Sequence, residues 1–155
     1  PYIEGLPVVA IGANAFADCS NLTAIILPES IREINEGSFQ NCSKLLEMVL
    51  PAGVKRIPNN VFQNCSSLMS INIPDGVKEI GNRAFFSCTQ LSSLHLPEGL
   101  TSIRSQAFRY CEKLESIVLP KSLINMDDWV FGECFSLLSI TIPEGVTRLR
   151  GGEFL

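Results

Sequence analysis

Phenylalanine recurs at a fixed interval along this chain. Seven phenylalanines lie 23 residues apart, from Phe16 to Phe154, without an insertion or deletion between them. A cysteine follows each of the first six phenylalanines by three residues, and a leucine follows each cysteine by three more. This regularity constrains the fold more than composition does, because every 23-residue unit must pack against its neighbours in the same way.

The repeated unit reads L-x-x-I-x-L-P-x-x-V-x-x-I-x-x-x-A-F-x-x-C-x-x. The alternating residues of L-x-x-I-x-L suit a short strand, and the following proline ends that strand because it has no N–H. The V-x-x-I half favours a second short extended segment on the opposite wall, and A-F-x-x-C favours a single helical or 3₁₀ turn. A period of about 20 to 29 residues with this motif is typical of leucine-rich repeats. We therefore predict a leucine-rich repeat solenoid with one parallel β-strand per coil, mostly β and irregular, with little helix.

The boundaries of the repeat array suggest a piece of a longer protein. We expect a single domain over residues 1–155, with about six full repeats and partial ends. At the N-terminal end Tyr2 and Glu4 occupy apolar strand columns, so the first strand is degenerate or shifted by one residue. At the C-terminal end Glu153 occupies the alanine column. Repeat proteins usually need polar caps over their end coils, so we expect either that the remaining sequence supplies them or that the ends pair with other molecules.

Six cysteines invite a disulfide or zinc interpretation, which their spacing decides. The chain contains neither C-x-x-C nor a second histidine beside His95, so a structural zinc site has no ligand set. Cysteines of adjacent coils fall within disulfide range, but in-register stacking points their side chains the same way. Free cysteine also behaves as a small buried hydrophobic residue. We expect an inward-facing cysteine column, with disulfides as the remaining alternative.

Charge and hydropathy exclude two classes of partner. The net charge is −4 and no stretch concentrates lysine or arginine, so nucleic acid and anionic lipid have no electrostatic attraction to this chain. No apolar run reaches the length of about 18 residues that a membrane span needs. We therefore expect no nucleic acid partner and no membrane insertion within this segment.

The L-x-x-I-x-L-P strand, V-x-x-I and A-F-x-x-C at a 23-residue period resemble the BspA-like leucine-rich repeat proteins, a class of bacterial and some protist surface proteins. Proline followed by serine or glycine, as in Pro51 and Gly53, is the specific part of this likeness. The resemblance implies a secreted or cell-surface protein that binds host or neighbouring-cell proteins, typically described as adhesion. It implies no catalytic residue, no cofactor and no fixed ligand motif.

Two sets of residues are candidates for protein binding. The first set faces outward beside the apolar strand positions: Asn72, His95, Val118 and Thr141. The second set consists of aromatic residues that interrupt otherwise polar columns in the turns of coils four to six: Phe86, Tyr110, Trp129 and Phe135. Exposed aromatic patches anchor protein interfaces. The alternatives are a plain solvated strand face and aromatic residues that only pack locally.

The function that these observations favour is a non-catalytic protein-binding module. The alternative is a structural spacer that presents a separate functional domain. An enzyme would need a converging cluster of nucleophile, base or metal ligands, whereas the residues that depart from the repeat are aromatic. We expect no metal and no cofactor, and the identity of the protein ligand and the oligomeric state stay open.

Overall fold

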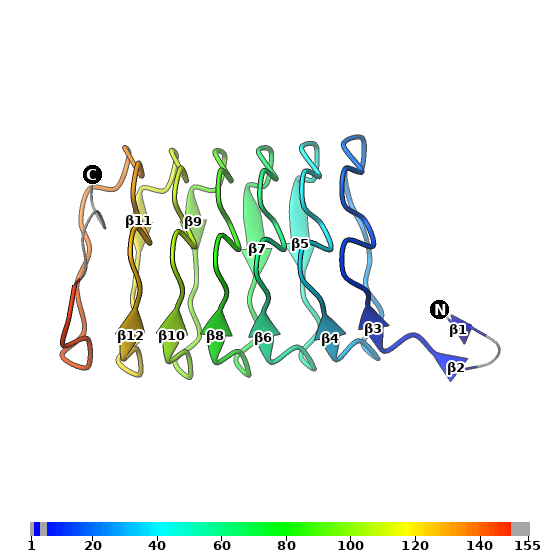
Figure 1. Cartoon of the computed structure of the whole chain (residues 1–155), viewed down its shortest axis with the longest axis horizontal. Helices are drawn as coiled ribbons and strands as arrows, with labels where there is room; N and C mark the ends of the chain where they lie inside the picture. The colour runs from blue at the N-terminus through cyan, green and yellow to red at the C-terminus, as the bar shows by residue number, and fades with distance from the viewer. Residues whose placement is uncertain (1, 4–5, 150–155) are drawn as a thin grey trace.

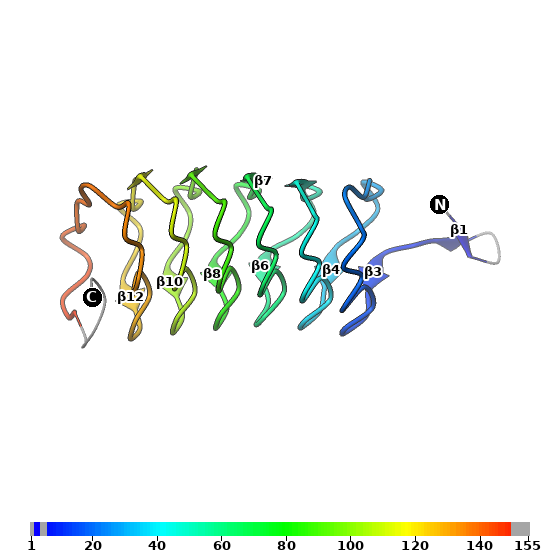
Figure 2. The ribbon, with the colours of Figure 1, turned by 90° about the horizontal axis from the view of Figure 1, so that it is seen from above.

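The computed structural model describes residues 2–3 and 6–149, with side chains from residue 6 onward. The chain forms a solenoid whose coils lie side by side along one axis (Figures 1 and 2). We number the coils 1 to 6 by the phenylalanine that each contains: Phe16, Phe39, Phe62, Phe85, Phe108 and Phe131. The predicted solenoid is therefore confirmed.

The V-x-x-I half of each unit forms one wall of the solenoid, which we call the valine wall. Its strands are β3 (Ala10–Ile11), β4 (Glu33–Ile34), β6 (Arg56–Ile57), β8 (Glu79–Ile80), β10 (Ser102–Ile103) and β12 (Asn125–Met126). Strands β6, β8, β10 and β12 form one parallel sheet in which residues 23 apart pair directly, as Ile57 does with Ile80. The predicted second extended segment is confirmed.

The L-x-x-I-x-L half forms the opposite wall, which we call the leucine wall. Its strands are β5 (Glu47–Val49), β7 (Ser70–Asn72), β9 (Ser93–Leu94) and β11 (Ser116–Ile117). β5 pairs with β7 and β9 with β11, in parallel and in register, and Ser139 of coil 6 bridges to Ser116. The parallel strand that this motif predicts is thus confirmed for coils 2 to 5, each of which also has a strand on the valine wall.

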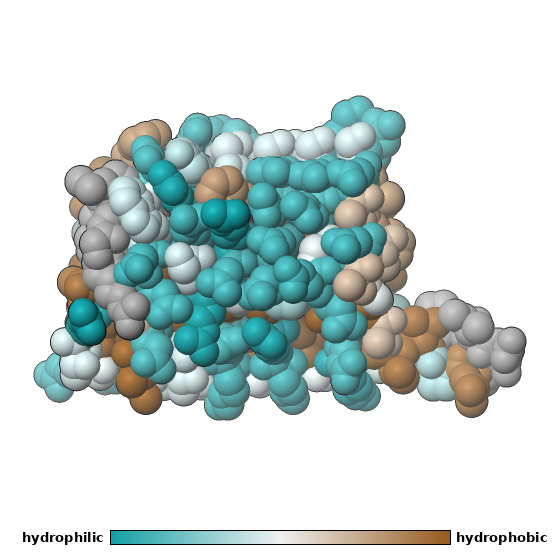
Figure 3. Space-filling model, in the orientation of Figure 1, coloured by the Kyte–Doolittle hydropathy of each residue, from teal (hydrophilic) through white to brown (hydrophobic). Residues whose placement is uncertain are grey.

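The A-F-x-x-C segments form a third wall, which we call the turn wall. It contains hydrogen-bonded turns and no helix in any described coil, so the prediction of a helical or 3₁₀ turn is wrong. Cys65 N–H donates to Phe62 O at 3.1 Å, as a 3₁₀ turn would, but Asn60 and Asn64 have φ of 55° and 61°. Left-handed residues interrupt a right-handed helix. Phe62 N–H instead donates to Ala84 O of the next coil at 2.9 Å. The face that carries the valine and turn walls is largely hydrophilic (Figure 3).

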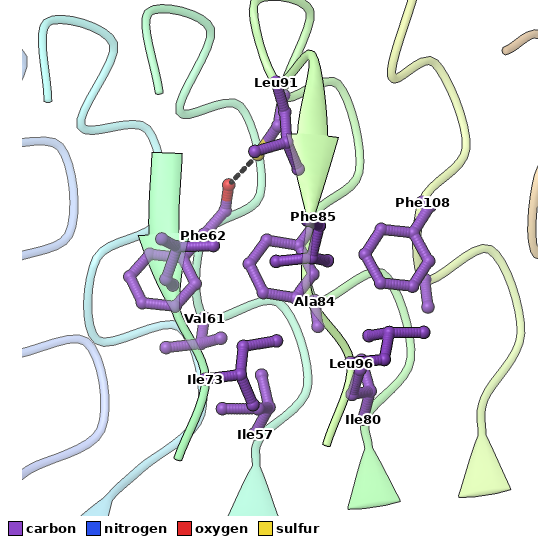
Figure 4. Close-up of a cluster of buried hydrophobic side chains, with 14 of the residues drawn as sticks. Ile57, Val61, Phe62, Ile73, Ile80, Ala84, Phe85, Leu91, Leu96 and Phe108 are labelled. Carbon is purple, nitrogen blue, oxygen red and sulfur yellow. Dashed lines mark hydrogen bonds between the residues drawn. The ribbon is translucent and has the colours of Figure 1, made fainter. Parts of the chain in front are cut away.

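A stack of phenylalanine rings runs through the core (Figure 4). Rings of adjacent coils lie 5.2–5.6 Å apart between centroids and within 17° of parallel. The column from Phe39 to Phe131 is buried, and Phe16 in coil 1 is partly exposed. Because each ring from Phe39 to Phe108 packs on the rings of both neighbouring coils, the core is continuous through the stack.

The cysteine column lies beside these rings, and all six thiols are free. Each cysteine from Cys42 to Cys134 donates its S–H to the carbonyl oxygen of the phenylalanine in the preceding coil, at 3.1–3.3 Å. Cys19 in coil 1 is exposed. The column is therefore more than the small hydrophobic filling that we predicted, because it also donates a hydrogen bond to the phenylalanine carbonyl of coils 1 to 5.

The N-terminal residues leave the stack. β1 (Tyr2–Ile3) pairs antiparallel with β2 (Leu6–Pro7), and this hairpin lies apart from the coils (Figures 1 and 2). Tyr2 does not join the leucine wall, in agreement with the degenerate first strand that its column predicts. Glu4, Glu153 and Phe154 lie outside the described residues.

Candidate binding surfaces

Two columns of the turn wall have left-handed backbones in every coil. The first column contains Asn14, Gly37, Asn60, Arg83, Gln106 and Trp129, and its φ values lie between 52° and 63°. The second contains Asp18, Asn41, Asn64, Ser87, Tyr110 and Glu133, with φ between 57° and 62°. Only glycine, asparagine and aspartate adopt this conformation readily. The backbone of the turn wall is thus uniform, and the residues that occupy it are not.

In coils 1 to 3 the left-handed columns hold residues that suit this backbone. Asn41 Nδ2 donates to Asp18 Oδ1 at 2.7 Å, and Asn64 Nδ2 donates to Asn41 Oδ1 at 2.8 Å. The three side chains form an amide ladder that connects three coils. The ladder explains the asparagines in structural terms, because each one combines a favourable backbone with a bond to the neighbouring coil.

In coils 4 to 6 the same columns hold residues that do not suit a left-handed backbone. Tyr110 has φ of 62° and Trp129 has φ of 61°, and neither side chain offers the local hydrogen bond that makes asparagine tolerable there. A residue held in this region costs about 1–3 kcal/mol, and such strain clusters at functional sites. The departure of coils 4 to 6 from the pattern therefore needs a compensating interaction.

An arginine connects the two strained aromatic side chains. The guanidinium carbon of Arg109 lies 4.8 Å from the ring centroid of Tyr110 and 4.7 Å from that of Trp129. Its Nη2 also donates to Glu133 at 3.3 Å. Each cation–π contact contributes about 0.5–1 kcal/mol at an exposed site and more when desolvated. The contacts of Arg109 thus offset part of the backbone strain.

Phe86 extends this group towards coil 4. Its ring meets that of Tyr110 edge-on, with centroids 5.2 Å apart, and the guanidinium of Arg83 lies 5.7 Å over it. Phe86, Tyr110 and Trp129 therefore lie close together, but all three are half-buried and in contact with arginine. Phe135 is 72% exposed and has no ring contact with them. Sequence reasoning missed Arg83 and Arg109.

The leucine wall presents the other predicted set. Asn72, His95, Val118 and Thr141 are all exposed and occupy equivalent positions in coils 3 to 6. Five further apolar residues at outward positions of this wall are also exposed: Ile26, Leu46, Val49, Met69 and Leu138. Ile26 is 96% exposed and Leu138 88% exposed. Leu46 and Met69 are apolar residues in a column that is polar in other coils, where it holds Thr23, Ser92 and Glu115. This departure could have identified them, but our prediction did not include that column.

The basic column of the valine wall serves the fold. Arg32 donates to Glu29 O and Lys55 donates to Ala52 O, so both cations bind turn carbonyls of their own coils. A Cβ at Gly53 would lie 2.6 Å from the backbone oxygen of Ile31, closer than van der Waals contact, and the side chain of Arg32 covers the same position. Glycine is thus needed where the backbone of the preceding coil approaches the turn closely. These charges do not form a free basic surface.

The buried cysteines offer no reactive thiol. Burial raises the pKa of Cys42 to about 11 and the pKa of Cys65 and Cys134 to about 12. Burial likewise raises the pKa of Cys88 and Cys111 well above the ordinary value. The thiolate is the nucleophile and metal ligand, so these side chains stay protonated hydrogen-bond donors.

Residues 6–149 contain no group of three or more histidine, cysteine or acidic residues that could hold a metal ion. No described helix is long and apolar enough to cross a membrane.

Solved structures with the same architecture come from bacteria. A leucine-rich repeat protein from Bacteroides ovatus is 40% identical, with a TM-score of 0.86, over 89% of this chain and 36% of its own. The Treponema pallidum (T. pallidum) leucine-rich repeat protein TpLRR is 30% identical, with a TM-score of 0.71, over 93% of this chain and 56% of its own. This chain thus spans about a third to a little over half of these proteins. A leucine-rich cell surface protein from Faecalibacterium prausnitzii is 25% identical, with a TM-score of 0.52, over 97% of this chain and 62% of its own.

A comparison with curated proteins finds no match. The family model of the BspA type leucine-rich repeat region matches residues 6–89 and 55–155, in six copies. These ranges cover nearly the whole chain and agree with the coils of the structure. The chain belongs to the BspA-type leucine-rich repeat family.

Proposed function

We propose that this chain is a protein-binding module of a cell-surface or secreted protein and that its partner docks on the leucine wall. One observation carries the proposal. Of the eleven large apolar residues exposed in the described part of the chain, six lie on this wall: Ile26, Leu46, Val49, Met69, Val118 and Leu138. A gathering of exposed apolar side chains on one face is typical of protein interaction sites.

The charge of the leucine wall supports the same conclusion. Its outward columns carry only two acidic residues in coils 2 to 5, Glu47 and Glu115, together with His95. Depletion of charge at the centre of a surface distinguishes interfaces better than bulk hydrophobicity does. Stacked repeats also offer an extended surface that a protein partner can contact over several coils.

Adhesion and surface display are the more specific parts of the proposal. The relative from Faecalibacterium prausnitzii is described as a leucine rich cell surface protein, which supports an extracellular location for this chain. An extracellular array with an apolar wall is suited to bind proteins of a host or of neighbouring cells. Antibody labelling of intact source cells tests the location, and labelling only after lysis would contradict it.

A binding experiment tests the docking surface. The purified chain is screened against immobilised fibronectin, fibrinogen, collagens and laminin, together with surface proteins of neighbouring bacteria. The double variant Val49→Glu, Met69→Glu places two charges on β5 and its neighbouring coil, and we expect it to weaken binding by about 100-fold or more. Burying an unpaired charge in an interface costs several kcal/mol.

The matched control is Ile124→Glu. Ile124 is also an exposed aliphatic residue, 56% accessible, but it lies beside β12 on the valine wall. We expect this variant to bind as the wild-type chain does. If both variants bind alike, the leucine wall is not the docking surface. If the chain binds none of the immobilised proteins, the structural spacer becomes the better account.

A further inference from the structure

A polar groove crosses the turn wall between coils 3 and 5. It has a volume of about 300 Å³ and is lined by Asn59, Asn60, Asn82, Arg83, Ser105 and Gln106. Four of the six lining residues carry a side-chain amide, and only one, Arg83, is charged. The groove lies on the hydrophilic face of the molecule (Figure 3), away from the leucine wall.

The hydrogen bonds within the groove leave donors and acceptors for a ligand. Asn59 Oδ1 accepts from Asn82, and Gln106 Oε1 accepts from Arg83 Nε at 2.7 Å. Asn60 Nδ2 donates to Glu36 at 3.1 Å. These bonds do not use the amide nitrogens of Asn59 and Gln106 or the amide oxygens of Asn60 and Asn82. An amide offers two donors and one acceptor, so each side chain retains capacity for a hydroxyl group.

An indole lies in the coil that follows the groove. Trp129 follows Gln106 in the same left-handed column, and Gln106 N–H donates to Asp128 O of that coil at 3.0 Å. The guanidinium carbon of Arg109 lies 4.7 Å from the ring centroid of Trp129 and holds the indole in place. The side chain of Trp129 remains partly exposed. A fixed, partly exposed indole combines an apolar surface with one N–H donor.

The backbone gives independent support for a role of these residues. Arg83, Gln106 and Trp129 have left-handed φ, from 52° to 61°, although none of the three is a residue type that favours this conformation. Coils 1 to 3 hold Asn14, Gly37 and Asn60 at the same position, which are residues that this backbone favours. Strain of this kind persists where the side chain has a function. The strained side chains here either line the groove or border it.

The composition of this surface selects the class of ligand. All six residues that line the groove are polar, and none of the large exposed apolar residues of the described chain is among them, so the apolar centre of a protein interface is absent from the groove. Amides that can pair with neighbouring hydroxyls, beside an aromatic ring that can pack on C–H groups, match the chemistry of a sugar. We propose that the groove binds an oligosaccharide, with the amides of Asn82 and Gln106 on its hydroxyls and the indole of Trp129 against a ring face.

A glycan array probed with the purified chain tests the proposal. Mammalian N- and O-linked glycans and bacterial and plant oligosaccharides are immobilised, and affinity for the strongest one is measured by calorimetry. Trp129→Asn should weaken binding by about tenfold, the factor expected when one aromatic contact is removed. Its Tm should stay unchanged or rise, because asparagine suits the left-handed backbone. Asn82→Ala should weaken binding severalfold.

The control is Asn14→Gly, which removes an amide from the same column in coil 1, away from the groove, and should leave the affinity unchanged. The proposal is overturned if no oligosaccharide binds above background. It is also overturned if Trp129→Asn binds sugar as the wild type does, since the indole would then make no contact with the ligand. The variant Val49→Glu, Met69→Glu should retain sugar binding, which separates this proposal from the docking function of the leucine wall.

Discussion

Coils 1 to 3 and coils 4 to 6 have the same backbone but differ in where their exposed apolar and aromatic side chains lie. In coils 1 to 3 the turn wall carries the amide ladder of Asp18, Asn41 and Asn64, and the leucine wall carries most of its exposed apolar residues. In coils 4 to 6 the turn wall carries Tyr110 and Trp129 around Arg109. The difference teaches that the core columns alone determine the coil, because the left-handed backbone persists even where its residues disfavour it.

The largest expected effect tests whether both halves share one core. Phe62→Ala and Phe108→Ala each remove a fully buried ring from the stack, one in each half. We expect both to lower the free energy of unfolding by about 3–5 kcal/mol, the usual cost of such a cavity. Urea denaturation followed by circular dichroism measures this loss. A cost for one half that is several-fold smaller would show that the two halves do not share a continuous core.

Alkaline pH probes the cysteine column, which both halves share. Unfolded thiols ionise near pH 9, whereas burial raises the pKa of Cys65 in the fold to about 12. Above pH 9 the unfolded chain therefore binds fewer protons than the folded chain, and stability falls as pH rises. Stability from this source is complete below pH 9 and is lost progressively up to about pH 12.

The measurement is Tm between pH 7 and pH 11, for the wild type and for Cys65→Ala. The variant lacks one raised pKa, so we expect its Tm to decline less steeply above pH 9 even if it starts lower. Parallel slopes for the two proteins would contradict the assignment of this decline to the buried thiols.

A substitution within the amide ladder should have a moderate effect. Asn64→Ala removes the bond to Asn41 Oδ1 and places alanine at φ of 61°. A left-handed alanine costs about 1–2 kcal/mol and the lost hydrogen bond adds about 1 kcal/mol. Asn64→Gly keeps the backbone favourable and should cost less. Equal losses for the two variants in chemical denaturation would mean that the backbone conformation contributes nothing.

The smallest expected effect is a gain. Ser87 occupies the same column as the ladder in coil 4, with φ of 57°, and lies one coil beyond Asn64. Ser87→Asn places an amide in a left-handed position of the kind it favours and within the register of the ladder. We expect Tm to rise by an amount that corresponds to about 0.5–1 kcal/mol, the usual gain from such a local improvement. A lower Tm would show that the ladder cannot continue into coil 4.

The sequence predicted the buried columns and not the surface. Phe85, Cys88 and Leu91 occupy columns that repeat in every coil, and period alone places such residues inside a solenoid. The left-handed columns were missed although Asn14 and Gly37 signal them, because Arg83 and Trp129 occupy the same register in later coils.

The candidate surfaces were predictable only in part. The outward direction of Val118 follows from strand alternation, and the structure places it on the leucine wall. The position of Arg109 between two rings depends on the backbone of two successive turns, for which no local sequence rule exists. The half-burial of Phe86 follows from that same arrangement.

The most direct test of the two-surface account combines its variants with both kinds of ligand. Binding of the wild type, Val49→Glu, Met69→Glu and Trp129→Asn is measured against the protein partner from the matrix panel and against the oligosaccharide from the glycan array. The account predicts that the first variant loses only protein binding and that the second loses only sugar binding. Loss of both ligands in either variant, with Tm unchanged, would contradict the separation of the two surfaces.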